Sequence, residues 1–397
     1  MRRLIALGVA LPAMAPVCAL AADWELNPRV EAGYLFDDNY RLTQPGTEIE
    51  VQGPLVDASL EMRARQPSGG EFSFTPRVRA TYFPDAKDLD SVDYFGTLDW
   101  QHHGQRLTTD LIGEFSQEDV VNSEQPSAEV PPDAGLGQPD IGDSGRVLVP
   151  NRRTRYSLQP NFDYDMSARR QIEFGGDFAD VSYDHEIPGA QLDYQNFGAY
   201  AGLVTRLSPA NSLTVRLRGA HFDIQSQGDS TAYGAELQWD TRNAADTQKY
   251  LRLGAQNVEL PTGGTEVAWV AGGGASVLKG RNTLFFDLSR NVGPSSSGIV
   301  VTRDALRFRW MFDMTPRMAF LAGVRGTHDD DVNPDSLFRA RSYATGDIGF
   351  QWRWQEEFSL HFSYDYTWQK FDDQLTDPAK SNGATLTFLY QPVQRRR

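Results

Sequence analysis

Residues 24–36 of the chain read WELNPRVEAGYLF. The even positions of this stretch hold apolar side chains, while the odd positions include Glu25, Asn27, Arg29 and Glu31. Successive side chains of a β-strand point to opposite faces, so the stretch has one apolar face with aromatic ends and one charged face. This division is typical of a strand that separates lipid from the water-filled lumen of a transmembrane barrel.

The same two-residue period recurs along the chain, for example at 72–82, 156–164, 306–312 and 358–368. It predicts strands at 24–36, 55–65, 71–83, 92–102, 106–116, 153–165, 170–183, 191–206, 212–223, 231–241, 248–259, 266–278, 283–292, 301–312, 317–328, 341–354, 358–370 and 382–391. The predicted fold is all-β: a transmembrane antiparallel up-and-down β-barrel of about 18 strands, with about 16 as the alternative. Short connections should alternate with long ones, and both termini should lie at the short-connection, periplasmic end.

Two details of this layout stay open. A change of phase between Tyr194 and Phe197 indicates either a β-bulge or a misplaced strand boundary. A soluble, secreted β-sandwich or solenoid would also alternate, although aromatic strand ends and many charges on the opposite face fit lipid and water better. A helical membrane protein is excluded, because no apolar run beyond the first 21 residues approaches the length that a spanning helix needs.

The first 21 residues follow the order of a secretory signal peptide: Arg2 and Arg3, an apolar run from Leu4 to Leu11, and small residues up to Ala21. We therefore expect a signal peptide at 1–21, an outer-membrane barrel at 22–391 and a basic periplasmic tail at 392–397. The last strand ends in an aromatic residue, Tyr390, like the terminal strand that the barrel assembly machinery recognises.

Composition narrows the function classes. The one cysteine, Cys18, leaves with the signal peptide, so the mature chain has no disulfide and no thiolate site. Loss of Arg2 and Arg3 changes the formal net charge from −15 to −17, and an acidic chain without a basic stripe argues against a nucleic-acid partner. We expect no cofactor, no metal ion and no catalytic residue; the expected partners are outer-membrane lipid and the barrel assembly machinery.

The stretch at 33–42, GYLFDDNYRL, resembles the start of an outer-membrane β-barrel family encoded in exopolysaccharide gene clusters. The resemblance covers the whole chain in length and strand layout, and its local motif is FDDN at 36–39. It implies an outer-membrane porin that acts with polysaccharide and with periplasmic export proteins. From the residues alone, Asp37, Asp38 and Asn39 suit a turn, and contact with a cation or sugar is the alternative.

Arginines on the predicted inward face are the candidate selectivity residues. Their guanidinium groups stay charged and pair well with carboxylate or phosphate, which would favour an anionic solute or polymer. The alternative is that lumen carboxylates pair with them and they only keep the wall hydrated and rigid. The candidates are Arg63, Arg65, Arg77, Arg79, Arg216, Arg218, Arg303, Arg307, Arg309, Arg325, Arg341 and Arg353.

Two loops could carry function. The connection at 117–151, rich in proline and acidic residues, either folds into the lumen or stands outside. The stretch at 329–335, DDDVNPD, has oxygens at alternating positions like the first half of a calcium loop, but Pro334 and Ala340 depart from that pattern, which favours a solvated acidic loop.

These features predict an outer-membrane channel, either for export of an exopolysaccharide or for passage of polar, anionic solutes. A structural or adhesive barrel with a closed lumen is the second hypothesis. A lipid-remodelling enzyme is the third, with His221 on the lipid face as its one pointer.

Overall fold

The computed structural model describes residues 23–128, 150–187, 190–224, 228–244, 246–261, 263–333, 340–372 and 377–392. The signal peptide at 1–21 and nearly all of the basic tail lie outside these residues. The described residues form eighteen strands: β1 (Asp23–Asp37), β2 (Val51–Arg65), β3 (Gly70–Thr81), β4 (Ser91–His103), β5 (Leu107–Asp119), β6 (Arg152–Ser167), β7 (Arg170–Tyr183), β8 (Tyr194–Arg206), β9 (Asn211–Ile224), β10 (Gly228–Ala244), β11 (Thr247–Leu260), β12 (Gly264–Lys279), β13 (Asn282–Ser295), β14 (Ile299–Thr315), β15 (Met318–Asp331), β16 (Arg341–Arg353), β17 (Phe358–Phe371) and β18 (Ala379–Tyr390).

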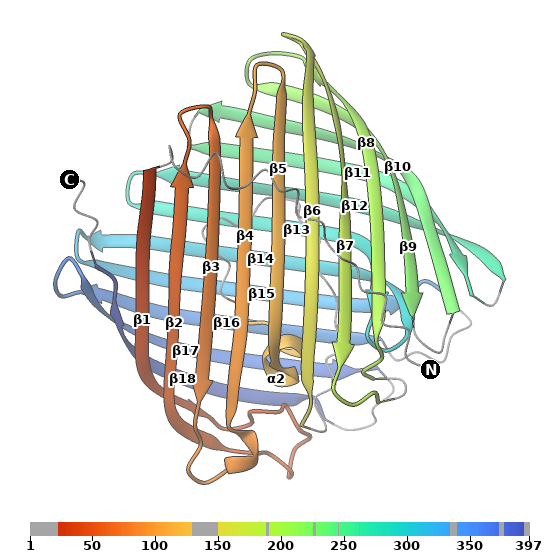
Figure 1. Cartoon of the computed structure of the whole chain (residues 1–397). Coiled ribbons are helices and arrows are strands. Elements are labelled where there is room, and N and C mark those ends of the chain that lie inside the picture. The colour runs from red at the N-terminus through yellow and green to blue at the C-terminus, as the bar shows by residue number, and fades with distance from the viewer. Residues whose placement is uncertain are drawn as a thin grey trace.

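Each strand pairs antiparallel with its neighbours in the chain, and the first strand pairs with the last (Figure 1). The register of this closing pair runs from Val30 opposite Tyr390 to Asp37 opposite Gly383. Closure leaves no strand edge unpaired, which a sheet in lipid requires because no water is there to bond free backbone groups. The count of 18 is therefore confirmed over 16.

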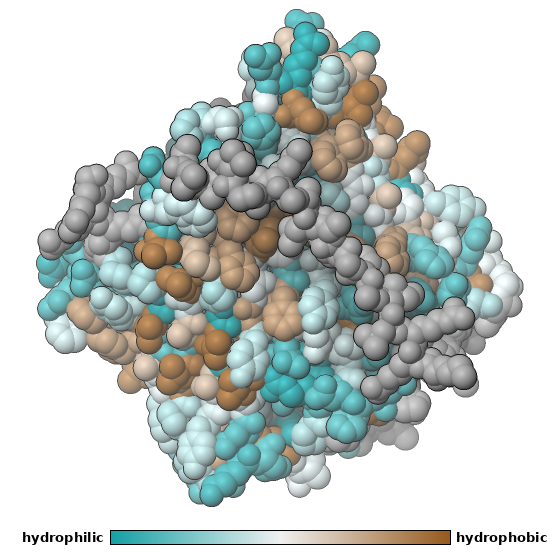
Figure 2. All heavy atoms as spheres, viewed as in Figure 1, coloured by the Kyte–Doolittle hydropathy of each residue, from teal (hydrophilic) through white to brown (hydrophobic). Residues whose placement is uncertain are grey.

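The outer face of the wall is apolar. Leu26, Leu217 and Val267 have exposed fractions of 60%, 63% and 71%. A soluble protein rarely leaves so extensive an apolar surface in contact with water. Figure 2 shows hydrophobic side chains gathered over the wall and hydrophilic ones along its lower edge. A closed, even-numbered antiparallel barrel with this outer face is a membrane-spanning barrel of the bacterial outer-membrane type.

The two ends of the barrel differ in their connections. At the short-turn end, each connection between strands has two to four residues, for example 66–69 and 168–169. At the loop end, the connections run from three residues up to the 32 residues of 120–151. The predicted alternation of short and long connections is confirmed, and β1 begins and β18 ends at the short-turn end. In an outer-membrane barrel this end is periplasmic.

Two helical turns interrupt the connections at the loop end: η2 (Lys87–Leu89) and α2 (Val120–Glu124). Across the described part of the chain, no helix has the length and apolarity to cross a membrane.

The phase change between Tyr194 and Phe197 is no β-bulge: both residues lie in β8, where Tyr194 is an apolar side chain buried on the lumen side and Phe197 is exposed on the outer face. The predicted strand began at residue 191, whereas β8 begins at Tyr194 and pairs with β7 and β9 without a shift of register. The predicted start was three residues early because residues 191–193 belong to the preceding connection, in which Gln191 bridges back to Ile187 and Leu192 is buried.

Candidate functional site

The Asp37–Asn39 stretch links β1 to β18 at the β1–β18 seam, the strand pair that closes the barrel. Asp37 Oδ1 accepts a hydrogen bond from the backbone N–H of Asn39 at 2.7 Å. The two carboxylate oxygens of Asp38 accept from the backbone N–H and the side-chain amide of Asn382 on β18, each at 2.7 Å. The predicted turn is confirmed, and the motif has a structural role at the β1–β18 seam. Contact with a cation or sugar stays a prediction.

Beyond this turn, residues 39–42 of the 38–50 connection fold inward, while residues 44–48 stay exposed. The side-chain oxygen of Asn39 accepts from the backbone N–H of Thr43 at 3.0 Å, and its amide donates to the carbonyl of Lys380 at 2.9 Å. Leu42 adopts a left-handed backbone with φ of +48°, which a leucine takes only when its surroundings hold it there. Tyr40, Arg41 and Leu42 are all buried as a result.

A hydrophobic cluster fills part of the lumen at the loop end. It joins side chains from four connections and from inward positions at the strand ends: Tyr40, Val51, Phe83, Leu89, Val120, Val121, Val181, Tyr183, Leu192, Tyr194 and Ile224. The rings of Tyr40 and Phe83 pack edge to face with centroids 5.2 Å apart. Burial raises the pKa of the Tyr40 phenol, and the nearby carboxylate of Asp119 adds to the effect, so this tyrosine stays neutral.

Residues 120–128, which we call the crossing segment, span the lumen from the β5 side to the opposite wall. Asp119 caps α2, because its side chain accepts from the backbone N–H of Val121 at 2.8 Å. The carbonyl of Glu124 then accepts from Arg341 Nη2 at 2.8 Å, and the carbonyl of Pro126 accepts from Tyr343 Oη at 3.0 Å. Both partners belong to β16, seven steps from β5 around the ring of eighteen strands.

Further contacts hold the crossing segment inside the barrel. The side chain of Glu124 is fully buried and accepts from Tyr183 Oη on β7 at 3.0 Å. On the far wall, a Cβ atom added to Gly323 would lie 3.0 Å from the carbonyl oxygen of Ala128, so a glycine leaves room for the close approach. Residues 120–128 of the 117–151 connection therefore lie inward, and 129–149 are outside the described residues (Figure 1).

The arginines of β2 and β3 line the lumen and are paired with carboxylates; Arg63 and Arg65 lie near the short-turn end, and Arg77 and Arg79 lie further toward the loop end. Arg77 and Arg79 share Asp57, at 2.6 and 3.1 Å. Arg63 pairs with Glu61, and Arg65 with Glu71 at 3.4 Å. The exposed fractions of these side chains run from 14% for Asp57 to 45% for Arg65.

Arg216 and Arg218 on β9 follow the same scheme. Arg216 pairs with Glu173 at 2.7 Å and stacks its guanidinium over the ring of Tyr200, 4.9 Å from the centroid. Arg218 pairs with Asp177 at 2.9 Å. Each acid lies on β7, so these bonds reach across β8.

The arginines of β14 to β16 form the wall that faces the crossing segment. Arg303 pairs with Asp329, with Nη2 to Oδ2 at 2.6 Å, and Arg307 pairs with Asp287 at 3.0 Å. Arg309 lies opposite Gly323 in the register, and Arg325 follows on the same strand as Gly323, so both flank the point where Ala128 approaches. The prediction of a solvated acidic loop at 329–335 is wrong at its start: Asp329, Asp330 and Asp331 belong to β15 and Asp329 is buried, while residues 334–339 are outside the described range.

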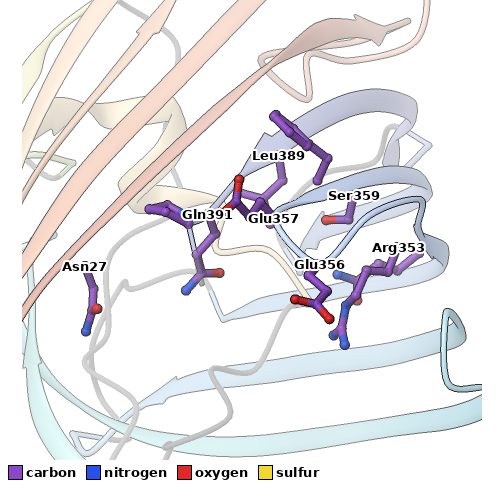
Figure 3. Close-up of a pocket in the computed structure, with 10 residues that line it drawn as sticks. Asn27, Arg353, Glu356, Glu357, Ser359, Leu389 and Gln391 are labelled. Carbon is purple, nitrogen blue, oxygen red and sulfur yellow. The ribbon is translucent and has the colours of Figure 1, made fainter. Parts of the chain in front are cut away.

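Arg353 lies apart from the others, in a pocket at the periplasmic mouth. The pocket has a volume of about 350 Å³ and is lined by Asn27, Gln351, Arg353, Glu356, Glu357, Phe358, Ser359, Leu389, Gln391 and Pro392. Figure 3 shows Asn27 across the pocket from Arg353 and Glu356. Amide, hydroxyl, cationic and anionic groups together make this a hydrophilic entrance rather than a basic one.

Sequence reasoning missed several lumen residues. Arg153 pairs with Glu118 at 3.0 Å and Arg252 with Glu236 at 3.9 Å, both buried; strand parity would have found the two arginines, whereas Glu118 was assigned to the 117–151 connection. Tyr183 and Tyr343, which hold the crossing segment, carried no signal in the sequence because their partners lie in a connection whose position, inside or outside the lumen, the sequence left open.

No family model matches the chain, and no curated protein matches its sequence. Among solved structures, OccK2 (OpdF) of Pseudomonas aeruginosa in complex with glucuronate is 13% identical, with a TM-score of 0.47, over 94% of this chain and 99% of that one. The outer membrane protein OpdK of the same organism is 12% identical with a TM-score of 0.46, over 93% and 99% of the two chains. OccAB4 of Acinetobacter baumannii is 11% identical with a TM-score of 0.46, over 93% and 98%. Likeness at this level indicates nothing about solutes, and the barrel is assigned from the chain's own strand pairing.

Proposed function

We propose that this barrel is an outer-membrane channel for small polar solutes, and that the crossing segment sets its narrowest point. The observation that carries this proposal is the pair of hydrogen bonds from Arg341 and Tyr343 to carbonyls of the crossing segment. A segment tied to opposite walls divides the lumen, so a solute must pass beside it. Small solutes fit this path better than a polymer.

The charges beside the crossing segment favour anions. Arg309 and Arg325 flank the approach of Ala128, and Arg341 contacts the segment directly, whereas Arg303 and Arg307 on the same wall are already paired with Asp329 and Asp287. Arg341 is fixed by two uncharged acceptors, the side-chain oxygen of Gln369 at 3.0 Å and the Glu124 carbonyl. Guanidinium groups held in place near a constriction attract carboxylates and phosphates and repel cations.

A barrel that is closed at rest is the second candidate, because the hydrophobic cluster occupies lumen space at the loop end. Export of an exopolysaccharide, which the family resemblance implies, would require the crossing segment to leave the lumen. The closed barrel and the polysaccharide exporter both predict little conductance until the crossing segment is displaced.

Planar-bilayer recordings test the proposal. The wild type should conduct, and the double variant Arg341→Gln with Tyr343→Phe should show larger or more frequently fluctuating conductance, because it removes both donors to the crossing segment. Tyr200→Phe is the matched control, since Tyr200 also bonds inside the lumen, to Asn161 at 2.7 Å, but does not contact this segment.

The outcomes separate the candidates. Conductance by the wild type that the double variant leaves unchanged would show that the crossing segment does not limit passage. A silent wild type with a conducting double variant would favour a channel closed at rest. Silence of both, with correctly folded barrels, would favour the structural or adhesive hypothesis.

A further inference from the structure

The outer surface of the barrel has a groove at its short-turn end, between β12, β13 and β14. It has a volume of about 500 Å³ and is lined by Val277, Lys279, Gly280, Arg281, Asn282, Leu284 and Phe312. The strand register places Val277 opposite Leu284 and Phe312 opposite Asn282, so these residues form one continuous surface.

The apolar wall of this groove continues into the lipid-facing belt. Leu284 shares its side of β13 with Phe286 and Leu288, whose exposed fractions of 43% and 52% mark the membrane face. The indole N–H of Trp310 donates to the side-chain oxygen of Asn282 at 3.0 Å, beside the groove. A tryptophan with its ring in the belt and its N–H bonded to a polar group is typical of the membrane–water boundary.

Two cationic side chains, Lys279 and Arg281, stand at the polar rim of the groove. Both are exposed, and Arg281 Nη1 donates to the carbonyl of Met314 at 3.1 Å, which holds its guanidinium beside the turn. Among the described residues, neither Lys279 nor Arg281 forms an ion pair. This distinguishes them from lumen arginines such as Arg77 and Arg216, whose charge is matched by carboxylates.

We propose that this groove binds one anionic phospholipid of the periplasmic leaflet. An acyl chain lies along Val277, Leu284 and Phe312, and the phosphate lies between Lys279 and Arg281. The combination fits because basic side chains at the level of the headgroups attract anionic lipid, while the apolar floor extends in the direction of the acyl chains. The proposal depends on the membrane-spanning barrel and is independent of what the lumen transports.

Native mass spectrometry of the full-length mature barrel in detergent, titrated with phosphatidylglycerol or phosphatidylcholine, tests this site. We expect one tightly retained phosphatidylglycerol per barrel and weaker retention of phosphatidylcholine. Lys279→Gln with Arg281→Gln should lower the affinity for phosphatidylglycerol by roughly tenfold or more, since each basic residue near the headgroups contributes on the order of a fivefold factor. The variant should keep heat-modifiable migration, because both side chains are on the surface.

A matched control removes two basic residues from another short turn. Arg169→Gln with Arg170→Gln removes the same amount of positive charge at the turn between β6 and β7. It should leave the affinity for phosphatidylglycerol unchanged. Phe312→Ala should weaken binding of long-chain phosphatidylglycerol while leaving the charges in place. Equal loss in both double variants would show a general charge effect and overturn the site. Unchanged affinity after Lys279→Gln with Arg281→Gln, or displacement of the lipid by inorganic phosphate alone, would overturn it as well.

Discussion

Two ion pairs in the wall have the same chemistry and lie at opposite ends of the lumen. Arg303 faces Asp329 across β14 and β15 at the loop end, and Arg65 faces Glu71 across β2 and β3 at the short-turn end. The side chains of the first pair are 8% and 4% exposed, whereas those of the second are 45% and 43% exposed. Both are direct cross-strand neighbours on the inward face, so strand parity cannot tell them apart.

The difference comes from the connections. At the loop end, the crossing segment and residues 39–42 of the 38–50 connection exclude water from the wall, while turns of two to four residues at the other end are too short to do so. A charge that loses its partner in a dry site costs far more than one that water can solvate. The two ends should therefore respond very differently to the same substitution.

The largest effect is expected for Arg303→Ala. It leaves the carboxylate of Asp329 buried without this partner, so the free energy of unfolding should fall by about 3–5 kcal/mol. Urea unfolding in detergent micelles, followed by tryptophan fluorescence, measures the change. Arg303→Met combined with Asp329→Leu should recover most of the loss, because no buried charge of this pair then remains. Equal losses in the single and double variants would show that the unpaired charge is not the cause.

Tyr183→Phe should have the next largest effect. Its hydroxyl donates to the buried carboxylate of Glu124, and removal of a donor to a buried charged group costs about 1–3 kcal/mol. The loss should appear as faster hydrogen exchange at 120–125, where the crossing segment leaves β5, as well as in the unfolding curve. The comparison with Tyr200→Phe, whose partner Asn161 is neutral, should show a smaller loss; a larger one for Tyr200→Phe would contradict the role given to Tyr183.

The two ends of the lumen can also be compared by their effect on ion selectivity. Arg309→Gln with Arg325→Gln removes two charges beside the crossing segment, and Arg63→Gln with Arg65→Gln removes two at the solvated end. Counter-ions screen charges beyond about 8 Å in 0.15 M salt. Charges on the wall of a wide mouth should therefore attract a passing ion less than charges on the wall of a narrow passage. Reversal potentials under a salt gradient should shift more for the first variant. A larger shift for the second would move the selective region to the periplasmic mouth.

The smallest effect is expected for Arg65→Ala. Exposed pairs contribute at most about 1 kcal/mol, and salt screens them further, so the unfolding free energy should change by less than that and the change should shrink at high ionic strength. The same urea titration at low and high salt measures it. A loss comparable to that of Arg303→Ala would mean that the two ends of the lumen are equally dry.

Strand positions could be predicted from the sequence because, within each strand, the alternation of apolar and polar residues shows which side chains face lipid and which face the lumen. The prediction of 170–183 matches β7 residue for residue, and the inward placement of Arg303 and Arg307 follows from the outward placement of Phe308. The start of β8 was predicted three residues early because Leu192, in the preceding connection, is buried in the same cluster as Tyr194 and continues its alternation.

Local periodicity therefore determined the barrel, its strand count and the facing of the arginines, since a strand between lipid and water must alternate whatever its partners are. Tertiary structure alone decided which arginines are buried, which carboxylates they meet and where the crossing segment lies. The contacts of Arg341 with Glu124 and of Tyr343 with Pro126 join residues 217 positions apart in the chain. Such contacts leave no period in the sequence, because they depend on closure of the ring bringing two distant walls to face each other.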